Sequence, residues 1–306
     1  MIQDAQVNQP LKILPFGRSL CLKPRWCFIS GLSRSVVHLI VIVFLICLLS
    51  SCTKEVALAL KADKPKLVIE AVISNDANGG YVKLSRSKAF TDNGKTQFIT
   101  SALVVMQDVS SGIKDTLRAG MEDSDSARYI THRIRPVSGH QYALSVEVDG
   151  NRYTASSVMP DTVTFKGVTL LSEAGKLSEK SIVTVVPRYQ DPAGVKNYYR
   201  FEQYVNLKKD PGVNVLTDNI GDGLLNERPI FTSSIDIHPG DTLEVVMIQI
   251  TKPIYDYFYQ LQLNQDELGA TPTNPPSNIV GPAPVLGYFS AEYRQHFVTQ
   301  LSLATK

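Results

Sequence analysis

The sequence predicts an all-β protein, with an N-terminal immunoglobulin-like β-sandwich at residues 67–160 and a second strand-rich domain with one short α-helix at residues 161–306. Two observations support this prediction. Short β-branched and aromatic segments recur from residue 67 onwards, and turns containing glycine, proline, asparagine or aspartate separate them. One segment, near residues 253–268, instead has apolar side chains at helical spacing.

The predicted sandwich contains seven short strands. In the clearest of them every second residue from Tyr142 to Val148 is apolar, as expected for a strand with one buried face. The pair Asp149-Gly150 follows directly and predicts a tight hairpin, because glycine adopts a positive φ at no steric cost. The predicted strands are residues 67–73, 81–85, 102–106, 113–117, 128–134, 141–148 and 151–156.

The second domain is predicted from longer and less regular strands and from its helix. Thr251 can cap this helix, and Pro253 lies in the first turn, where a missing N–H costs nothing. Apolar residues follow at helical spacing, and Gly269 ends the helix. The predicted strands of this domain are residues 181–189, 197–205, 228–237, 241–250 and 286–291.

The N-terminus has the pattern of a bacterial lipoprotein signal peptide. A basic flank precedes the apolar run 39–49, which is short of the roughly 20 residues needed to span a bilayer. Two serines then precede Cys52, and small residues there suit a peptidase that cleaves before a lipidated cysteine. Residues 1–51 are therefore predicted to be a signal peptide, and residues 52–66 a lipidated N-terminus and tether. An uncleaved signal anchor is the alternative.

Cleavage would change the charge and the thiol content of the chain. The whole chain has 31 basic and 29 acidic residues, of which residues 1–51 contain five and one. The remainder has 26 basic and 28 acidic residues, a net charge of −2. Cys52 would be the single remaining cysteine and would carry the lipid, with acyl chains such as palmitate, so no disulfide is expected. This charge balance offers no basic patch for nucleic acid, which we exclude as a partner.

The sequence contains no motif of a familiar catalytic or cofactor site. The histidines lack the spacing of zinc ligands, and there is no Gly-x-Ser-x-Gly nucleophile elbow. The pattern Ser-x-x-Lys occurs at residues 85–88 and 111–114, but at a strand end and in a hairpin turn rather than at the start of a helix. We therefore expect no catalytic residue, no cofactor and no enzymatic activity.

Residues 218–223 are the best metal candidate that the sequence offers. Asp218 and Asp222, with Glu227 nearby, give this segment the oxygen density of a calcium loop. It lacks the alternating acidic positions and the distal glutamate of an EF-hand. A plain turn is the favoured interpretation, and a calcium-dependent ligand-binding module is the alternative.

Tyrosines supply the candidate binding residues. Tyr255 and Tyr259 lie on the predicted helix, and a tyrosine combines a large apolar ring with a polar tip that suits sugar stacking or a protein contact. Packing within a half-buried sandwich is the favoured alternative. The single tryptophan, Trp26, would be lost with the signal peptide, which makes glycan binding a weaker prediction.

Several segments follow the N-terminal motif in a recognisable order. They are LVIEAVISN at residues 67–75, YVKLSRS at 81–87, YALSVEVDGNRYTASSVMP at 142–160, the tyrosine-rich helix, and NPPSNIVGPAPVLGYFSA at 274–291. In these features the chain resembles the Bacteroidota lipoproteins grouped as domain of unknown function family 4249. The resemblance implies a surface or periplasmic lipoprotein of the outer membrane, encoded near TonB-dependent receptors. It implies no catalytic residue, because the biochemical role of the family is uncharacterised.

Two classes of function follow from these features. The preferred hypothesis is a non-enzymatic outer-membrane lipoprotein, held in the membrane by lipid on Cys52, that acts as an accessory or binding partner of a TonB-dependent receptor. The competing hypothesis is a secreted, lipid-anchored hydrolase whose site is assembled from residues far apart in the sequence. The sequence is compatible with either face of the outer membrane.

Overall fold

The computed structural model describes residues 35–36, 38–39, 64–77, 79–88, 92, 94–123, 126–172, 183–231, 235–238, 240–265 and 272–301, with no description of the side chains of residues 121–126 and 172. The chain divides into two compact units, residues 1–61 and residues 62–306. The fold below is that of the second unit. Cys52 lies outside the described residues, and the division at residue 160 stays a prediction.

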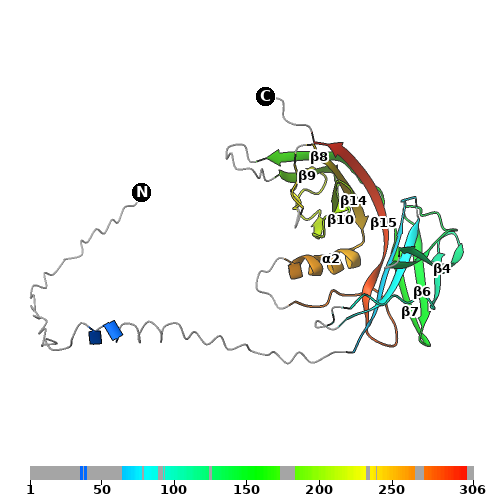
Figure 1. Cartoon of the computed structure of the whole chain (residues 1–306). Coiled ribbons are helices and arrows are strands. Elements are labelled where there is room, and N and C mark those ends of the chain that lie inside the picture. Colours follow the sequence, from blue (N-terminus) through cyan, green and yellow to red (C-terminus); the bar gives the residue numbers. More distant parts are fainter. Residues whose placement is uncertain are drawn as a thin grey trace, which may run out of the picture. The chain divides into compact units, whose positions relative to one another are not determined.

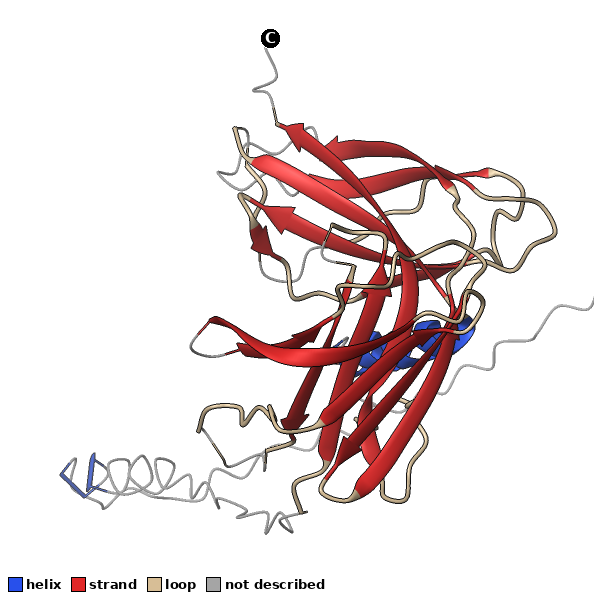
Figure 2. Cartoon of the chain, turned by 90° about the vertical axis from the view of Figure 1, so that its right-hand side faces the viewer, coloured by secondary structure: helices blue, strands red, loops and turns tan. Residues whose placement is uncertain are grey.

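Strands make up most of the second unit (Figures 1 and 2). A mixed sheet of twelve strands has the order β11-β10-β14-β15-β1-β2-β5-β4-β3-β6-β7, with β12 paired to β10, and a three-stranded sheet has the order β13-β9-β8. The strands of the large sheet are β1 (Leu67–Ser74), β2 (Gly80–Arg86), β3 (Leu103–Asp108), β4 (Lys114–Asp123), β5 (Ser126–Ile130), β6 (Gln141–Val148), β7 (Asn151–Val158), β10 (Tyr198–Val205), β11 (Lys208–Lys209), β12 (Asn214–Thr217), β14 (Thr242–Ile250) and β15 (Val285–Gln300). The strands of the small sheet are β8 (Thr164–Ser172), β9 (Val183–Gln190) and β13 (Leu225–Asn226).

The strand β15 belongs to both halves of the large sheet. Its first half pairs in parallel with β1, from Val285 opposite Leu67 onwards, and its second half pairs antiparallel with β14. Figure 1 shows β15 as the long, curved strand that runs from the region of β6 and β7 to the region of β8. Because one continuous strand serves both halves, they share a backbone hydrogen-bond network.

Three buried apolar clusters hold the unit together. The first joins side chains of β1, β2, β5 and β15 to side chains of β3, β6 and β7. The second lies between the small sheet and one face of β10 and β14, and the third lies between the other face of these strands and the helix α2 (Lys252–Gln265). The alternation along β15 shows how one strand serves two clusters, because Phe289 enters the first cluster and Tyr288 the third.

The prediction of a mostly β protein with a short helix is confirmed, whereas the immunoglobulin-like sandwich is not. All seven strands predicted before residue 160 exist. Tyr142, Leu144 and Val146 are buried as predicted, and Asp149 and Gly150 both have positive φ in the hairpin between β6 and β7. The strands nevertheless form one continuous order in which β4 pairs with both β3 and β5, and β1 has a parallel neighbour from the end of the chain.

The second half departs from the prediction in several places, among them the short strands β11, β12 and β13, which were not predicted. Residues 228–231 and 235–238 contain no strand, because Pro229 lacks an N–H and Phe231 donates its N–H to the Asn214 side chain. The strand β8 was not predicted, since Gly167 interrupts its apolar pattern at a register shift. The closing strand runs nine residues beyond Ala291, the end predicted for it.

The helix α2 begins within one residue of its predicted start, and its predicted last residues, 266–268, lie outside the described residues. Among the residues described, none of the helices has the length and apolar character needed to cross a bilayer.

We predict that Gly287→Ala strongly destabilises the unit. Gly287 has a φ of +97°, and a Cβ atom at this position would lie 2.0 Å from the backbone carbonyl oxygen of Ile69 on the neighbouring strand β1. Since residue 287 and Ile69 lie opposite each other on paired strands, neither can move away cheaply. The expected loss in free energy of unfolding is about 3 kcal/mol or more, measured by urea denaturation.

The matched control is Gly139→Ala. Gly139 also has a positive φ, +79°, but nothing lies within 4 Å of a Cβ built there. This substitution should cost only the backbone strain, about 1–2 kcal/mol. Equal losses in the two variants would contradict the role that we assign to the contact between β1 and β15.

Candidate functional site

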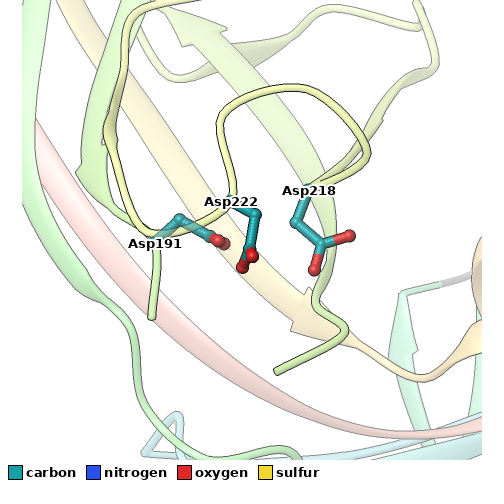
Figure 3. Close-up of side chains that lie close together, drawn as sticks. All are labelled: Asp191, Asp218 and Asp222. Atoms are coloured by element: carbon teal, nitrogen blue, oxygen red, sulfur yellow. The ribbon is translucent and has the colours of Figure 1, made fainter. Parts of the chain in front are cut away.

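Three aspartates converge where two loops of the second half meet (Figure 3). Asp191 follows the last residue of β9, Asp218 follows the last residue of β12, and Asp222 lies in the loop that leads to β13. One carboxylate oxygen of each lies within 4.8 Å of the other two. We call these residues the three-aspartate cluster. Asp191 and Asp218 are each 1 % exposed, whereas Asp222 is exposed.

Strand pairing explains why residues this far apart in the sequence meet. The end of β12 pairs with the start of β10, so that Thr217 lies opposite Tyr198. The start of β13 pairs with the end of β9, so that Leu225 lies opposite Gln190. The loop from β9 to β10 and the loop from β12 to β13 are therefore fixed against each other at both ends.

The carboxylates accept hydrogen bonds that cross between these loops. Gly194 N–H donates to Asp222 at 2.9 Å, and Gly223 N–H donates to Asp191 at 3.3 Å, so that each loop binds the other. Asp218 accepts a hydrogen bond from the backbone N–H of Asn197 at 3.0 Å.

Two further donors come from side chains. The Lys196 ammonium donates a hydrogen bond to Asp218 at 3.2 Å, and the buried Tyr199 hydroxyl donates one to Asp191. Burial, together with the hydrogen bond to Asp191, raises the pKa of Tyr199 well above its ordinary value, so that this hydroxyl stays protonated. All three carboxylates therefore have protein donors.

The cluster is chemically suited to two roles. Carboxylate oxygens are calcium ligands at about 2.3–2.6 Å, so oxygens within 4.8 Å of one another can share one ion. The same groups already hold the two loops together through hydrogen bonds, which is the role of a structural clasp. The structure brings together Asp218 and Asp222 as the sequence suggested, and it adds Asp191. Glu227 is not in the cluster and instead pairs with Arg188 at 2.6 Å.

The tyrosine candidates lie on the helix beside the start of β10. The rings of Tyr255 and Tyr259 stack with centroids 5.5 Å apart and an angle of 13° between their planes, and Tyr198 packs on Tyr255 at 5.3 Å. Tyr259 is 43 % exposed and Tyr255 is half-buried. The faces of the stacked rings are directed at each other, so packing accounts for much of their surface. A binding role for Tyr255 and Tyr259 stays a prediction.

The sequence did not predict a second group of charges, on the sheet face that also carries α2. We call it the ionic cluster. Its centre is Glu202, which accepts hydrogen bonds from Arg200 at 2.7 Å and from Arg294 at 2.7 Å. Arg294 also contacts Glu292 at 2.8 Å. The members of the ionic cluster are Asp76, Arg200, Glu202, Lys209, Glu244, Glu292, Arg294 and His296.

Charge compensation keeps the buried centre of this cluster ionised. Desolvation alone would raise the pKa of Glu202, but the cations of Arg200 and Arg294, with Lys209, outweigh it and hold that pKa well below its ordinary value. The pKa of Arg294 is raised, because the attraction of the surrounding carboxylates outweighs its own desolvation. Breaking such a pair would leave an uncompensated buried charge, so these residues depend on one another.

His296 stands at the solvent side of the ionic cluster. Its Nδ1 lies 2.8 Å from Glu244 and its Nε2 lies 3.0 Å from Asp76. Desolvation lowers the pKa of His296, but the hydrogen bonds to the two carboxylates outweigh this and raise it above the ordinary value. The charged ring can donate to both carboxylates, whereas the neutral ring can donate to only one.

A signal for the ionic cluster does exist in the sequence. Glu292, Arg294 and His296 alternate at period two, which is typical of one face of a strand. The burial of Glu292 and the ion pairs of Arg294 could not be read from this pattern, because they depend on the pairing of β15 with β14 and on the partners from β10.

We predict that excess calcium leaves the melting temperature unchanged. The carboxylates of the three-aspartate cluster already accept hydrogen bonds from backbone amides, Tyr199 and Lys196. Calcium would have to compete with these donors. Thermal unfolding of the full chain, with calcium and with a chelator, is the measurement.

The comparison variant is Asp222→Asn, which removes the exposed charge and keeps an oxygen for the Gly194 hydrogen bond. It should behave like the wild type in both solutions. A calcium-dependent rise in melting temperature that disappears in Asp222→Asn would establish a cation site in place of a clasp.

We also predict that stability falls as the pH rises above about 6.5 and through the raised folded-state pKa of His296. Because the folded-state pKa is raised, the contribution of the charged ring is complete below about pH 6.5, the ordinary value for histidine. It is lost as the pH rises through the folded-state pKa. The measurement is the free energy of unfolding at several pH values between 6 and 9.

His296→Gln should flatten this pH dependence, since glutamine does not titrate. His238→Gln, in a loop outside the ionic cluster, serves as the control and should retain the wild-type slope. If His296→Gln keeps that slope, another group causes it.

Comparison with known proteins places most of the strand-rich unit in one family. Among curated proteins, no sequence matches the chain. The family described as Domain of unknown function (DUF4249) matches residues 53–295, which include the three-aspartate cluster and most of the ionic cluster. The chain belongs to this family.

Proposed function

We propose that the protein is a non-enzymatic lipoprotein of the outer membrane, anchored by lipid on Cys52, and that it acts as an accessory or binding partner of a TonB-dependent receptor. The observation that carries this proposal is Cys52 itself, preceded by a basic flank, an apolar run of signal-peptide length and two serines. A lipid with three acyl chains suffices for stable attachment to a membrane.

The strand-rich unit suits a binding role at the end of a tether. We propose an immunoglobulin-like arrangement for its first seven strands, a type of module that often serves recognition. Its second half exposes apolar side chains on the loops that the three-aspartate cluster joins. Val195 is 54 % exposed, Ile220 72 % and Leu224 62 %. Exposed apolar side chains on ordered loops favour a protein contact.

The competing function is a secreted hydrolase or a calcium-dependent module, and among the described residues the three-aspartate cluster is the site that we consider for it. Two of its carboxylates are buried and hydrogen-bonded to the protein, which leaves little access for a substrate. The calcium titration described above distinguishes a calcium site from a structural clasp.

We predict that the receptor is recovered with the protein from native outer membranes. The full chain carrying an affinity tag at its C-terminus is crosslinked in cells and isolated from solubilised membranes, and its partners are identified by mass spectrometry. The wild type should carry lipid on Cys52 and recover a TonB-dependent receptor.

The matched variant is Cys52→Ser, which cannot form the thioether to lipid. It should lose both the lipid mass and most of the receptor, because anchoring raises the effective concentration of the two partners. Recovery of lipidated wild-type protein without any receptor would overturn the accessory role. A mature chain that retains residues 1–51 would overturn the anchor itself.

A further inference from the structure

A pocket lies at the end of the strand-rich unit where the tether enters the fold. It has a volume of about 360 Å³, which is within the range of small-ligand sites. Its lining comes from the ends of several strands: Leu67 begins β1, Arg86 ends β2, Val148 ends β6 and Asn151 begins β7. Because β1 and β15 are parallel, the segment that leads into β15 reaches the same end.

The floor and one wall of the pocket are apolar and fixed. Tyr153 is 4 % exposed and Val148 7 %, and both also belong to the first apolar cluster. The wall is the segment that contains Ala283 and Pro284. It is tied to β7 by two backbone hydrogen bonds of 2.8 Å between Thr154 and Val280.

Gly281 brings this wall close to the floor. A Cβ atom at residue 281 would lie 2.2 Å from the Tyr153 ring, so that only glycine permits this approach. The cavity is therefore bounded by residues that packing and hydrogen bonds hold in place.

The rim of the pocket is cationic. Lys64, Lys66 and Arg86 contribute three positive charges, and Asp149, which pairs with Arg86, contributes one negative charge. The formal charge of these four side chains is therefore +2. A cationic rim over an apolar floor suits a ligand with an anionic head and an apolar body.

The position of the pocket indicates the source of such a ligand. Lys64 is the twelfth residue after Cys52, so an extended tether keeps the mouth within about 40 Å of a lipid-anchored cysteine. Anionic lipid headgroups would then be present at high effective concentration. This step rests on the proposed anchor at Cys52, whereas the charge and the shape of the pocket do not.

We propose that this pocket binds the phosphate of a lipid headgroup, with the three cations around the phosphate and the adjoining apolar body of the lipid against Tyr153 and Val148. Such binding would orient the strand-rich unit on the membrane surface and hold its tether end towards the lipid.

The test measures binding of a soluble phospholipid to the full chain in a neutral detergent. The probe is dihexanoyl phosphatidic acid, and the comparison ligands are dihexanoyl phosphatidylcholine and inorganic phosphate, all titrated by calorimetry. Phosphatidic acid should bind, the choline lipid should bind at least about tenfold more weakly, and inorganic phosphate should also bind more weakly because it lacks the apolar body.

Two substitutions are expected to weaken the binding of phosphatidic acid and one to strengthen it, which distinguishes a ligand-binding role from a structural one. Lys66→Gln and Arg86→Gln should weaken the binding of phosphatidic acid about tenfold. Asp149→Asn should strengthen it, because it also breaks the pair with Arg86 but removes the negative charge from the rim. Lys114→Gln, which changes the same charge in a different surface groove, is the control and should bind like the wild type.

Three results would overturn the proposal: no binding of phosphatidic acid to the wild type, an equal loss in Lys114→Gln and Lys66→Gln, or weaker binding in Asp149→Asn. Equal affinity for inorganic phosphate would overturn the assignment to a lipid headgroup. The proposed anchor is tested by the lipid mass on Cys52. Binding of phosphatidic acid is measured in detergent solution and does not depend on that anchor, so the two proposals can fail separately.

Discussion

The pairing of β15 with both β1 and β14 is the constraint on which the rest of the structure depends. One strand supplies the parallel neighbour of the first strand and the antiparallel neighbour of β14, so the two halves cannot form their full sheets separately. Gly287 lies so close to the carbonyl of Ile69 that this pairing leaves no room for a side chain at residue 287. The two faces of β15 then distribute side chains between different clusters, with Phe289 in the first and Tyr288 in the third.

The polar chemistry of the unit follows from the same strand. Alternation along β15 places Glu292 and Arg294 on the face that also holds Glu202 of β10. These charges are buried because β14 lies between β10 and β15 and α2 covers part of that face. A buried charge is tolerable only when it is paired, so the ionic cluster couples the register of three strands to one another. The parallel start of β1 and β15 likewise brings the wall of the cationic pocket to the end where the tether enters.

The sequence predicted local structure well and distant contacts poorly. The hairpin at Asp149-Gly150 and the start of the helix at Pro253 depend on neighbouring residues, and both are where the sequence indicated. The three-aspartate cluster was only partly foreseeable. Asp218 and Asp222 share one loop, but Asp191 comes from the preceding strand connection and meets them only because β12 pairs with β10 and β13 with β9. The strand β8 was missed because Gly167 disrupts the pattern that marks a strand.

The sequence by itself determined the mostly β character, most of the strands and the position of the helix, because periodicity and turn residues act over a few residues. It also defined the N-terminal motif that ends at Cys52, from which the proposed anchor comes. Only the tertiary structure decided that the first strand pairs with the last, that Asp191 joins the three-aspartate cluster while Glu227 does not, and that Lys66 and Arg86 border one cavity. These features depend on contacts between segments up to 218 residues apart, such as Leu67 and Val285, and no local pattern encodes a partner at that distance.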